Sequence, residues 1–382
     1  MIEEFRCGGY TVRCYGSIRQ LPAPLWDTKI AQNHPYKTAA FMRKLEICFP
    51  DRDVVYLAVY ENDDMVGLTL ATFEYFDPTL GFRPWALKLV TAMRRIWNRL
   101  LAVPMAMVGT YETAQEHWWF DAGRINANQF AKILLEAIGR HLPKPTITIV
   151  RDFVDSKDQC FRDALVTRRF RAVDNHPMAA IHLNGLTSKA HYARLRARAR
   201  HTLRKLDATP ANKVEITNHD CFEGILDECY QLYLNVHNKA EDFQRPALPK
   251  VFLEMIGELP ETRISVLRMP TGEIGAFLMT GFSETISAPS IIGMDYQQSR
   301  EFMLYHHGLW QSVEEAAKHG CREIDLGLTG YFVKQSLGAE LHTLTICLRL
   351  ENSWLDRLLG ARLARALSAP PPEKRRLFRE SQ

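Results

Sequence analysis

A run of basic side chains in the middle of the chain is the first feature that could do chemistry. The segment YARLRARARHTLRKL, residues 192–206, carries six basic residues and no acid: Arg194, Arg196, Arg198, Arg200, Arg204 and Lys205. Spacings of three and four predict a single helix with Ser188 as its N-cap and one stripe made of Tyr192, Leu195, Ala199, Thr202 and Leu206. Such a helix attracts an anion, which could be nucleic acid, an acidic membrane, or a phosphorylated small molecule or carrier. A solvated helix face is the alternative.

Two carboxylates follow or end predicted strands in the second half of the chain. Asp295 comes directly after SIIGM, and Asp325 lies in REIDLG. Either could accept a proton as a general base. A helix N-cap or turn is the alternative for Asp295, and a structural role is the alternative for Asp325.

Two tyrosines and a histidine pair lie near the same elements. Tyr296 and Tyr305 could donate a proton to a leaving group, with packing in the core as the alternative. His306 is a third candidate for the general base, but it and His307 fall inside a predicted helix, where packed or solvated histidines are expected.

Composition and motifs exclude several classes of protein. The 382 residues are 46% hydrophobic and 24% charged, which indicates a globular chain of about two domains. The net charge of +4 is too small to imply nucleic-acid binding by itself. The eight cysteines form no CxxC pair, so we expect reduced thiols and no metal site. There is no G-x-S-x-G elbow, Walker A loop or Rossmann glycine fingerprint.

Membrane contact is open at two basic amphipathic segments, residues 85–108 and 353–367. Core-facing helices with exposed arginines are the alternative reading of both. The N-terminus begins with acidic residues and lacks an apolar run, which argues against a signal peptide. We therefore expect a cytoplasmic protein, with peripheral contact at the inner membrane face as a further option.

The chain repeats one order of elements. The segments VVYLAVY and RISVLRM each precede a polar turn and a second strand, which predicts a hairpin in each half. Residues 126–150 and 303–327 both read as helix, loop and strand, with Gly320 after the second helix. The segments TAAFMRKLEICFP and PALPKVFLEMIGELP predict comparable upstream helices. These repeats predict two α/β units with a similar order of elements. Near the seam between the units we expect a strand at 179–183 and an Asn184-Gly185 turn.

The second half resembles the GNAT-type acyltransferases of the FemAB-like branch, in which two GNAT-like units are fused. The resemblance begins at SKAHYARLRARARHTLRKL and continues through YQLYLNVHNKAEDF, GEIGAFLM and IIGMDYQQSREFMLYHHGLWQSVEEAAKHGCREIDLG to YFVKQSLGAELHTL. It covers about residues 187–350, and the first half, including PYKTAAFMRKLE, resembles the degenerate first unit. The resemblance implies an α/β (α+β) fold of two tandem units, each with a mixed, mostly antiparallel sheet flanked by helices and splayed at its centre. We expect domains at 1–184 and 185–352, followed by an amphipathic helix and a disordered basic tail at 353–382.

The resemblance also implies a site. An acyl donor would lie in the splay, and an amine would be the acceptor. Lys334 matches the family's late lysine and could hold the oxyanion or an anionic substrate group. Lys239 and Phe243 fall where the family folds a substrate loop, and Arg196, Arg200 and Asp325 would complete the substrate side.

The donor would bind near the start of the second long helix. The family's Gly-rich pyrophosphate turn is replaced by DYQQSREFMLYHHG, so Ser299, Arg300 and Tyr296 would bind the donor there with backbone amides. We expect Asp295, Lys334 and Tyr305 to be catalytic, no permanently bound cofactor, and acyl-CoA as the co-substrate.

The sequence thus predicts an N-acyltransferase that moves an acyl group from a thioester of coenzyme A or a carrier protein to a small-molecule amine or a cell-wall precursor. Two alternatives remain open. One is peptide-bond formation from aminoacyl-tRNA, and the other is a non-catalytic GNAT-like scaffold that binds a membrane or a partner.

Overall fold

The computed structural model describes residues 1–76, 92–93, 101–154, 158–208, 210–239, 246–371, 373 and 377–378. Within these ranges the chain forms two compact units, each built from separated segments. The first unit comprises Met1–Ile30, Phe49–His176 and Thr343–Pro370, and the second comprises Ala31–Cys48, Pro177–His342 and Pro371–Gln382. These units differ from the continuous ranges 1–184 and 185–352, which stay a prediction for the domain boundaries.

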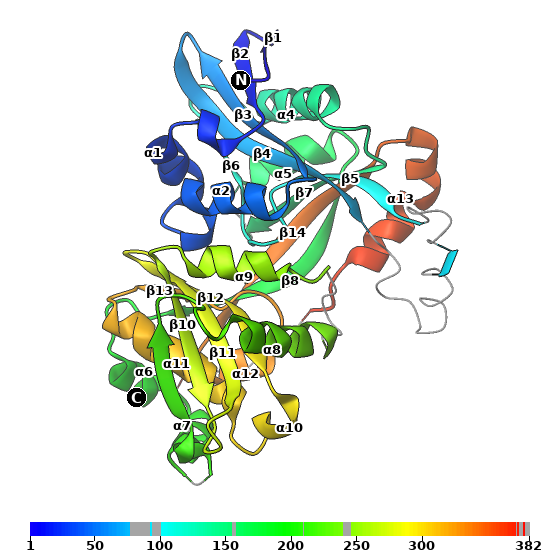
Figure 1. Ribbon diagram of the computed structural model, residues 1–382. Coiled ribbons are helices and arrows are strands. Elements are labelled where there is room, and N and C mark those ends of the chain that lie inside the picture. The colour runs from blue at the N-terminus through cyan, green and yellow to red at the C-terminus, as the bar shows by residue number, and fades with distance from the viewer. Residues whose placement is uncertain are drawn as a thin grey trace. The chain divides into compact units, whose positions relative to one another are not determined.

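The first unit is a sheet covered by helices (Figure 1). Its strands follow the order β1-β2-β3-β4-β5-β7-β14, with β6 paired to β4. The strands are β1 Glu3–Cys7, β2 Tyr10–Tyr15, β3 Asp53–Glu61, β4 Asp64–Phe76, β5 Val103–Val108, β6 Trp118–Phe120, β7 Ile147–Val154 and β14 Glu340–Leu350, of which residues 340–342 belong to the second unit. The helices are η1 Ile18–Gln20, α1 Ala23–Trp26, η2 Asp27–Ala31, α4 Ala127–His141, α5 Gln159–Val166 and α13 Ser353–Leu367.

The second unit is a sheet in the order β8-β13-β12-β11-β10-β9. Its strands are β8 Arg171–His182, of which residues 171–176 belong to the first unit, β9 Glu215–His219, β10 Thr262–Arg268, β11 Ile274–Phe282, β12 Ile286–Met294 and β13 Glu323–Asp325. Its helices are η3 Pro35–Lys37, α2 Ala39–Cys48, α6 Ser188–Arg194, α7 Ala197–Arg204, η5 Lys205–Asp207, η6 Ala211–Lys213, α8 Leu226–Lys239, α9 Lys250–Gly257, α10 Tyr296–Ser299, α11 Leu304–Lys318 and α12 Tyr331–Ser336.

The repeated order of elements is confirmed. Each unit has an antiparallel hairpin, a third antiparallel strand, a fifteen-residue helix and then a parallel strand: β3, β4, β5, α4 and β7 in the first unit, and β10, β11, β12, α11 and β13 in the second. The first hairpin turns through Asn62 and Asp63, both with positive φ, as a type I′ turn requires. Gly320, with φ +75°, follows the end of α11 as predicted.

The basic segment is not one helix, and that prediction was wrong. It forms α6 and α7, and the chain is extended between them at Leu195 and Arg196. Leu195 makes an isolated β-bridge with Phe378, so a backbone pairing interrupts the helix. The N-cap is Thr187, whose hydroxyl accepts from the Ala190 N–H, and Ser188 is the first helical residue.

The apolar side of this segment packs on α11. Leu195, Ala199, Leu203 and Leu206 are buried in one cluster with Leu309, Val313 and Ala316 of that helix. Leu203 therefore takes the position in the buried stripe that was predicted for Thr202. Burial of these aliphatic side chains, at about 25 cal/mol per Å² of apolar surface, holds α7 in place.

The two predicted amphipathic helices have different outcomes. Residues 103–108 are strand β5, so the amphipathic helix expected over 85–108 is wrong there, and residues 85–91 and 94–100 lie outside the described residues. The helix expected at 353–367 is confirmed as α13. In the tail, the Gln335 side chain donates to the Glu373 carbonyl, and Phe378 packs beside Arg194.

Candidate functional site

Two parallel strands of the second unit separate after a short pairing. β13 pairs with β12 only at Ile286↔Glu323 and Ser287↔Ile324, whereas β12 continues to Met294 along β11. This is the splay implied by the resemblance. Asp325 ends β13 and Asp295 follows β12, so both predicted carboxylates lie at carboxyl ends of the diverging strands.

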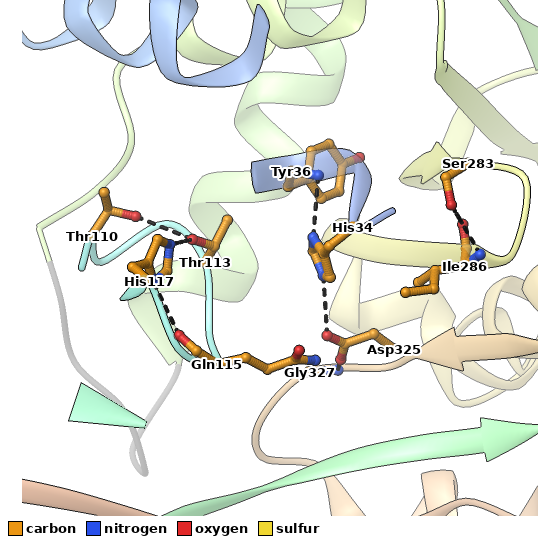
Figure 2. Close-up of polar contacts among 10 residues, drawn as sticks. All are labelled: His34, Tyr36, Thr110, Thr113, Gln115, His117, Ser283, Ile286, Asp325 and Gly327. Atoms are coloured by element: carbon orange, nitrogen blue, oxygen red, sulfur yellow. Dashed lines mark hydrogen bonds and ion pairs between the residues drawn. The ribbon is translucent and has the colours of Figure 1, made fainter. Parts of the chain in front are cut away.

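Asp325 is a buried carboxylate held by two donors. His34 Nε2 lies 3.2 Å from Asp325 Oδ2, and the Gly327 N–H donates to Asp325 Oδ1 at 2.7 Å (Figure 2). The Tyr36 N–H donates to His34 Nδ1 at 3.2 Å, so Nδ1 carries the lone pair and Nε2–H points to the carboxylate. The pair therefore joins the η3 segment to the end of β13 within the second unit.

The ionisation of this pair follows from its burial. Desolvation lowers the pKa of His34, so its imidazole is neutral. The pKa of Asp325 is also lowered: burial would raise it, but the hydrogen bond from His34, the Gly327 amide and the nearby Lys37 together outweigh that effect. An ionised Asp325 beside a neutral His34 is suited to holding a loop, because both carboxylate oxygens already accept hydrogen bonds.

Lys334 is a buried lysine on α12. Its Nζ donates to the Leu328 carbonyl at 2.7 Å. Burial lowers its pKa to about 8, although the charge of Asp325 acts in the opposite direction. Its ammonium thus loses its proton two or more pH units earlier than an exposed lysine would.

Tyr305 and Lys334 approach the same glycine. A Cβ at Gly330 would lie 2.8 Å from the Tyr305 hydroxyl and 3.8 Å from Lys334 Cε, and Gly330 has φ +63°. Any other residue there would be strained and would push on the tyrosine. Burial raises the pKa of Tyr305 to about 12, so the phenol stays protonated and can donate a hydrogen bond or a proton.

Lys239 and Tyr296 make a second contact beside Tyr305. The Lys239 ammonium lies 3.8 Å from the centre of the Tyr296 ring, a cation–π distance. The Tyr296 phenol also helps to raise the pKa of Tyr305, so the two phenols lie close enough to interact electrostatically. The structure thus places Lys239, Tyr296, Tyr305, Lys334 and Asp325 in a chain of neighbours.

The other predicted site residues make separate contacts or lie outside the described residues. The Asp295 carboxylate caps α10 by accepting from the Gln297 N–H at 2.8 Å, which is the structural role weighed for it. Ser299 donates to the Met294 sulfur at 3.4 Å, and Arg300 is exposed. Phe243 lies outside the described residues.

The two predicted arginines belong to the basic segment. Arg196 is exposed at the N-cap position of α7, and Arg200 is half-buried with its Nε unpaired. The other basic side chains of the segment, Arg194, Arg198, Arg204 and Lys205, are exposed. Most basic side chains of this segment therefore face solvent, as the alternative of a solvated helix face predicted.

The family model described as an acetyltransferase (GNAT) domain matches residues 193–335. Among solved structures, FemX aligns over 91% of this chain and 99% of its own, with 11% identity and a TM-score of 0.61. A tandem GNAT protein from the clavulanic acid biosynthesis pathway aligns over 88% and 98%, with 10% identity and a TM-score of 0.54. A conserved protein of unknown function from Bacteroides thetaiotaomicron aligns over 86% and 98%, with 12% identity and a TM-score of 0.51.

This chain has a FemAB-like tandem GNAT fold. No curated protein matches its sequence. Within the described ranges of this chain, no helix combines the length and the hydropathy needed to cross a bilayer.

The first GNAT-like unit holds a closed polar network at the corresponding strand ends. After β5, Thr113 Oγ1 lies 2.8 Å from His117 Nε2 and 3.2 Å from Thr110 Oγ1 (Figure 2). At the end of β7, Arg151 donates to Asp152 and to the Thr110 carbonyl. These side chains pair with one another and with backbone carbonyls, as buried polar groups in a structural core do.

Sequence reasoning missed the residues that come from the η3 segment. His34 and Lys37 are buried in the second unit, where both act on the ionisation of Asp325. They stand about 290 residues before Asp325, so no local pattern connects them. The available signal was the clustering HPYK, in which two ionisable side chains flank a proline turn just before a helix.

Proposed function

We propose that the second unit transfers an acyl group to an amine. The observation that carries this proposal is the buried Lys334 ammonium beside the Tyr305 hydroxyl at Gly330, next to the end of a splayed GNAT strand. A cation and a phenol on one side of a reacting carbonyl suit acyl transfer, because negative charge develops on the carbonyl oxygen.

The proposed steps divide the work among these groups. The acceptor amine attacks the acyl carbon, and its proton passes to a base, for which Asp295 is the candidate. Lys334 stabilises the oxyanion of the tetrahedral intermediate. The carbon–sulfur or carbon–oxygen bond to the donor then breaks, and Tyr305 supplies the proton that the leaving group takes up. Asp325 and His34 position the 325–330 segment that carries Gly330.

The proposed donor is an acyl thioester of coenzyme A or a carrier protein. Ser299, Arg300 and Tyr296 stand between β12 and α11, where the GNAT fold directs donor phosphates toward a helix N-terminus. No glycine occurs between Asp295 and Leu304, and Met303 itself adopts the left-handed conformation, with φ +52°. Phosphate binding would therefore rely on Arg300 and Ser299 more than on a glycine turn. Lys239 and the arginines at 196 and 200 are proposed to contact the acceptor.

An aminoacyl-tRNA donor is the second candidate, and the basic segment favours it. Arg194, Arg196, Arg198, Arg204 and Lys205 are all exposed on one short stretch. Single-stranded or helical RNA bound there through Z phosphates would show log K falling with log salt at a slope of about −0.7Z to −0.9Z. Binding of tRNA without such a slope would count against this donor.

A membrane-bound scaffold is the third candidate, and α13 supplies its observation. Trp354 is 67% exposed, Leu358 is 55% exposed and Leu359 is 40% exposed on this helix, among several arginines. Flotation with anionic liposomes, together with failure to bind thioester or tRNA, would support a scaffold instead of an enzyme.

Native mass spectrometry of the freshly purified chain, followed by turnover assays, tests the proposal. We expect the mass spectra to show an acyl thioester bound to the chain, either as purified or after it is added. In the turnover assays we expect free thiol to be released when amines are supplied. The Asp295→Asn and Lys334→Met variants should both lose activity. Full activity in both folded variants would overturn the site, and transfer only from aminoacyl-tRNA would replace the donor.

A further inference from the structure

A cluster of two histidines and a glutamate lies outside the proposed acyl-transfer site. His182 is the last residue of β8, Glu340 is the first residue of β14, and His342 follows two residues later. One ligand atom from each of the three lies within 4.8 Å of the others. Glu340 and His342 share one side of β14, because side chains alternate along a strand.

The two imidazoles face each other through their Nε2 atoms. These nitrogens are 3.3 Å apart, and the ring planes cross at 83°. Two nitrogens bound to one tetrahedral zinc at about 2.0–2.1 Å would be separated by about 3.3–3.4 Å, so the observed spacing already suits a shared metal.

A fourth side chain orients the first histidine. His182 Nδ1 lies 3.4 Å from Glu323 Oε2. Metal-bound histidines commonly donate their other ring N–H to a carboxylate, which directs the free lone pair toward the metal. Glu323 thus has the place of an outer partner, and Glu340 that of a carboxylate ligand.

From this geometry we propose that His182, Glu340 and His342 bind a divalent transition-metal ion of the zinc type. Two imidazoles and one carboxylate select zinc, nickel or copper over magnesium or calcium, which prefer oxygen ligands. Three protein ligands leave one position for water. Glu340 is exposed and both histidines are half-buried, so the metal can enter from solvent.

The site was not predicted from the sequence, which led us to expect no metal. That expectation rested on cysteine spacing, whereas the histidines here stand 160 residues apart along the chain. Bound metal would join the end of β8 to the start of β14. We therefore expect it to raise the unfolding temperature of the second unit.

Calorimetric titration of the metal-free full chain with Zn²⁺ tests the proposal. We expect saturable binding of one ion and at least a tenfold loss of affinity in His182→Ala and in His342→Ala. His201→Ala, which removes an exposed histidine of α7, is the matched control and should bind as the wild type does. Substitution by Co²⁺ should give the strong visible absorption of a tetrahedral site.

The exposed Glu340 provides a variant that keeps the test independent of folding. Glu340→Gln should fold normally and weaken Zn²⁺ binding about tenfold. Zn²⁺ should raise the unfolding temperature of the wild type and not that of His182→Ala. Absence of stoichiometric binding in the folded wild type, or unchanged affinity in all three site variants, would overturn the proposal.

Discussion

At the scale of single residues, the account depends on how burial sets the ionisation of Lys334 and His34. Both lie in the second unit with their polar atoms directed at named partners, the Leu328 carbonyl and the Asp325 carboxylate. Lys334 was identified in the sequence through the family resemblance. His34 was not, because its partner is distant along the chain and a histidine before a proline has no distinctive local pattern.

The first residue-scale prediction is that Lys334→Met stabilises the folded protein at neutral pH. The pKa of Lys334 in the folded chain, about 8, is lower than the usual lysine value of 10.5, so burial penalises the charged form. That penalty is complete below pH 8 and is relieved as pH rises toward 10.5. We expect a gain of about 1–3 kcal/mol at pH 7, after loss of the Leu328 hydrogen bond, and a smaller gain at pH 10. Urea unfolding of both proteins at the two pH values measures it, and a difference that does not change with pH would contradict it.

The second residue-scale prediction concerns acid sensitivity. Because burial lowers the pKa of His34, the unfolded chain takes up a proton at this histidine below about pH 6.5 while the folded chain does not. Its contribution to stability is therefore lost as pH falls below that value. His34→Asn should show a smaller fall in the free energy of unfolding between pH 7 and pH 5. Equal falls in the two proteins would show that His34 takes up its proton over the same pH range in the folded and unfolded chains, which would contradict the lowered pKa.

At the scale of elements, the strands, hairpins and long helices could be predicted because each has a local cause. Turn residues, alternating hydrophobic residues in strands and helical spacings of three and four residues are all signals carried by residues close together in the sequence. The break between α6 and α7 could not be predicted, because it accompanies a backbone bridge from Leu195 to Phe378, far along the chain. The same reason hid the place of α2: its Phe41 packs on Phe252 of α9, and its Lys44 pairs with Glu258 just after α9.

The element-scale prediction concerns the close packing of β12 on α8. A Cβ at Gly293 would lie 2.6 Å from the Tyr233 backbone nitrogen and 2.7 Å from the Leu232 carbonyl carbon. Backbone atoms cannot yield as a flexible side chain can, so Gly293→Ala should destabilise the protein by about 2–4 kcal/mol. Thermal and urea unfolding measure this loss.

Gly308 of α11 supplies the matched control. A Cβ there would meet only Ile292 Cδ1, at 3.8 Å, an ordinary contact. Gly308→Ala should therefore be neutral or stabilising by up to about 1 kcal/mol, because alanine favours a helix interior. Similar losses in both variants would refute the packing argument.

At the scale of the whole molecule, one order of elements occurs twice with different contents at the strand ends. The first unit closes that place with a network of threonine, histidine, arginine and aspartate side chains, whereas the second places a lysine and a tyrosine around a glycine. The tandem architecture could be predicted from repeated patterns. The composition of each unit from separated segments could not, since it arises from contacts between distant parts of the chain.

The central claim is that acyl transfer depends on Lys334, and one comparison of rates tests it most directly. The measurement is kcat/KM for transfer to an amine, with the donor that the wild type uses, for wild type, Lys334→Met and Lys318→Met. Lys318 lies at the exposed end of α11, and its replacement controls for loss of a lysine. We expect a loss of at least 100-fold in Lys334→Met and none in Lys318→Met, since removal of one oxyanion donor costs about 10²–10³. An unchanged rate in a folded Lys334→Met protein would contradict the account.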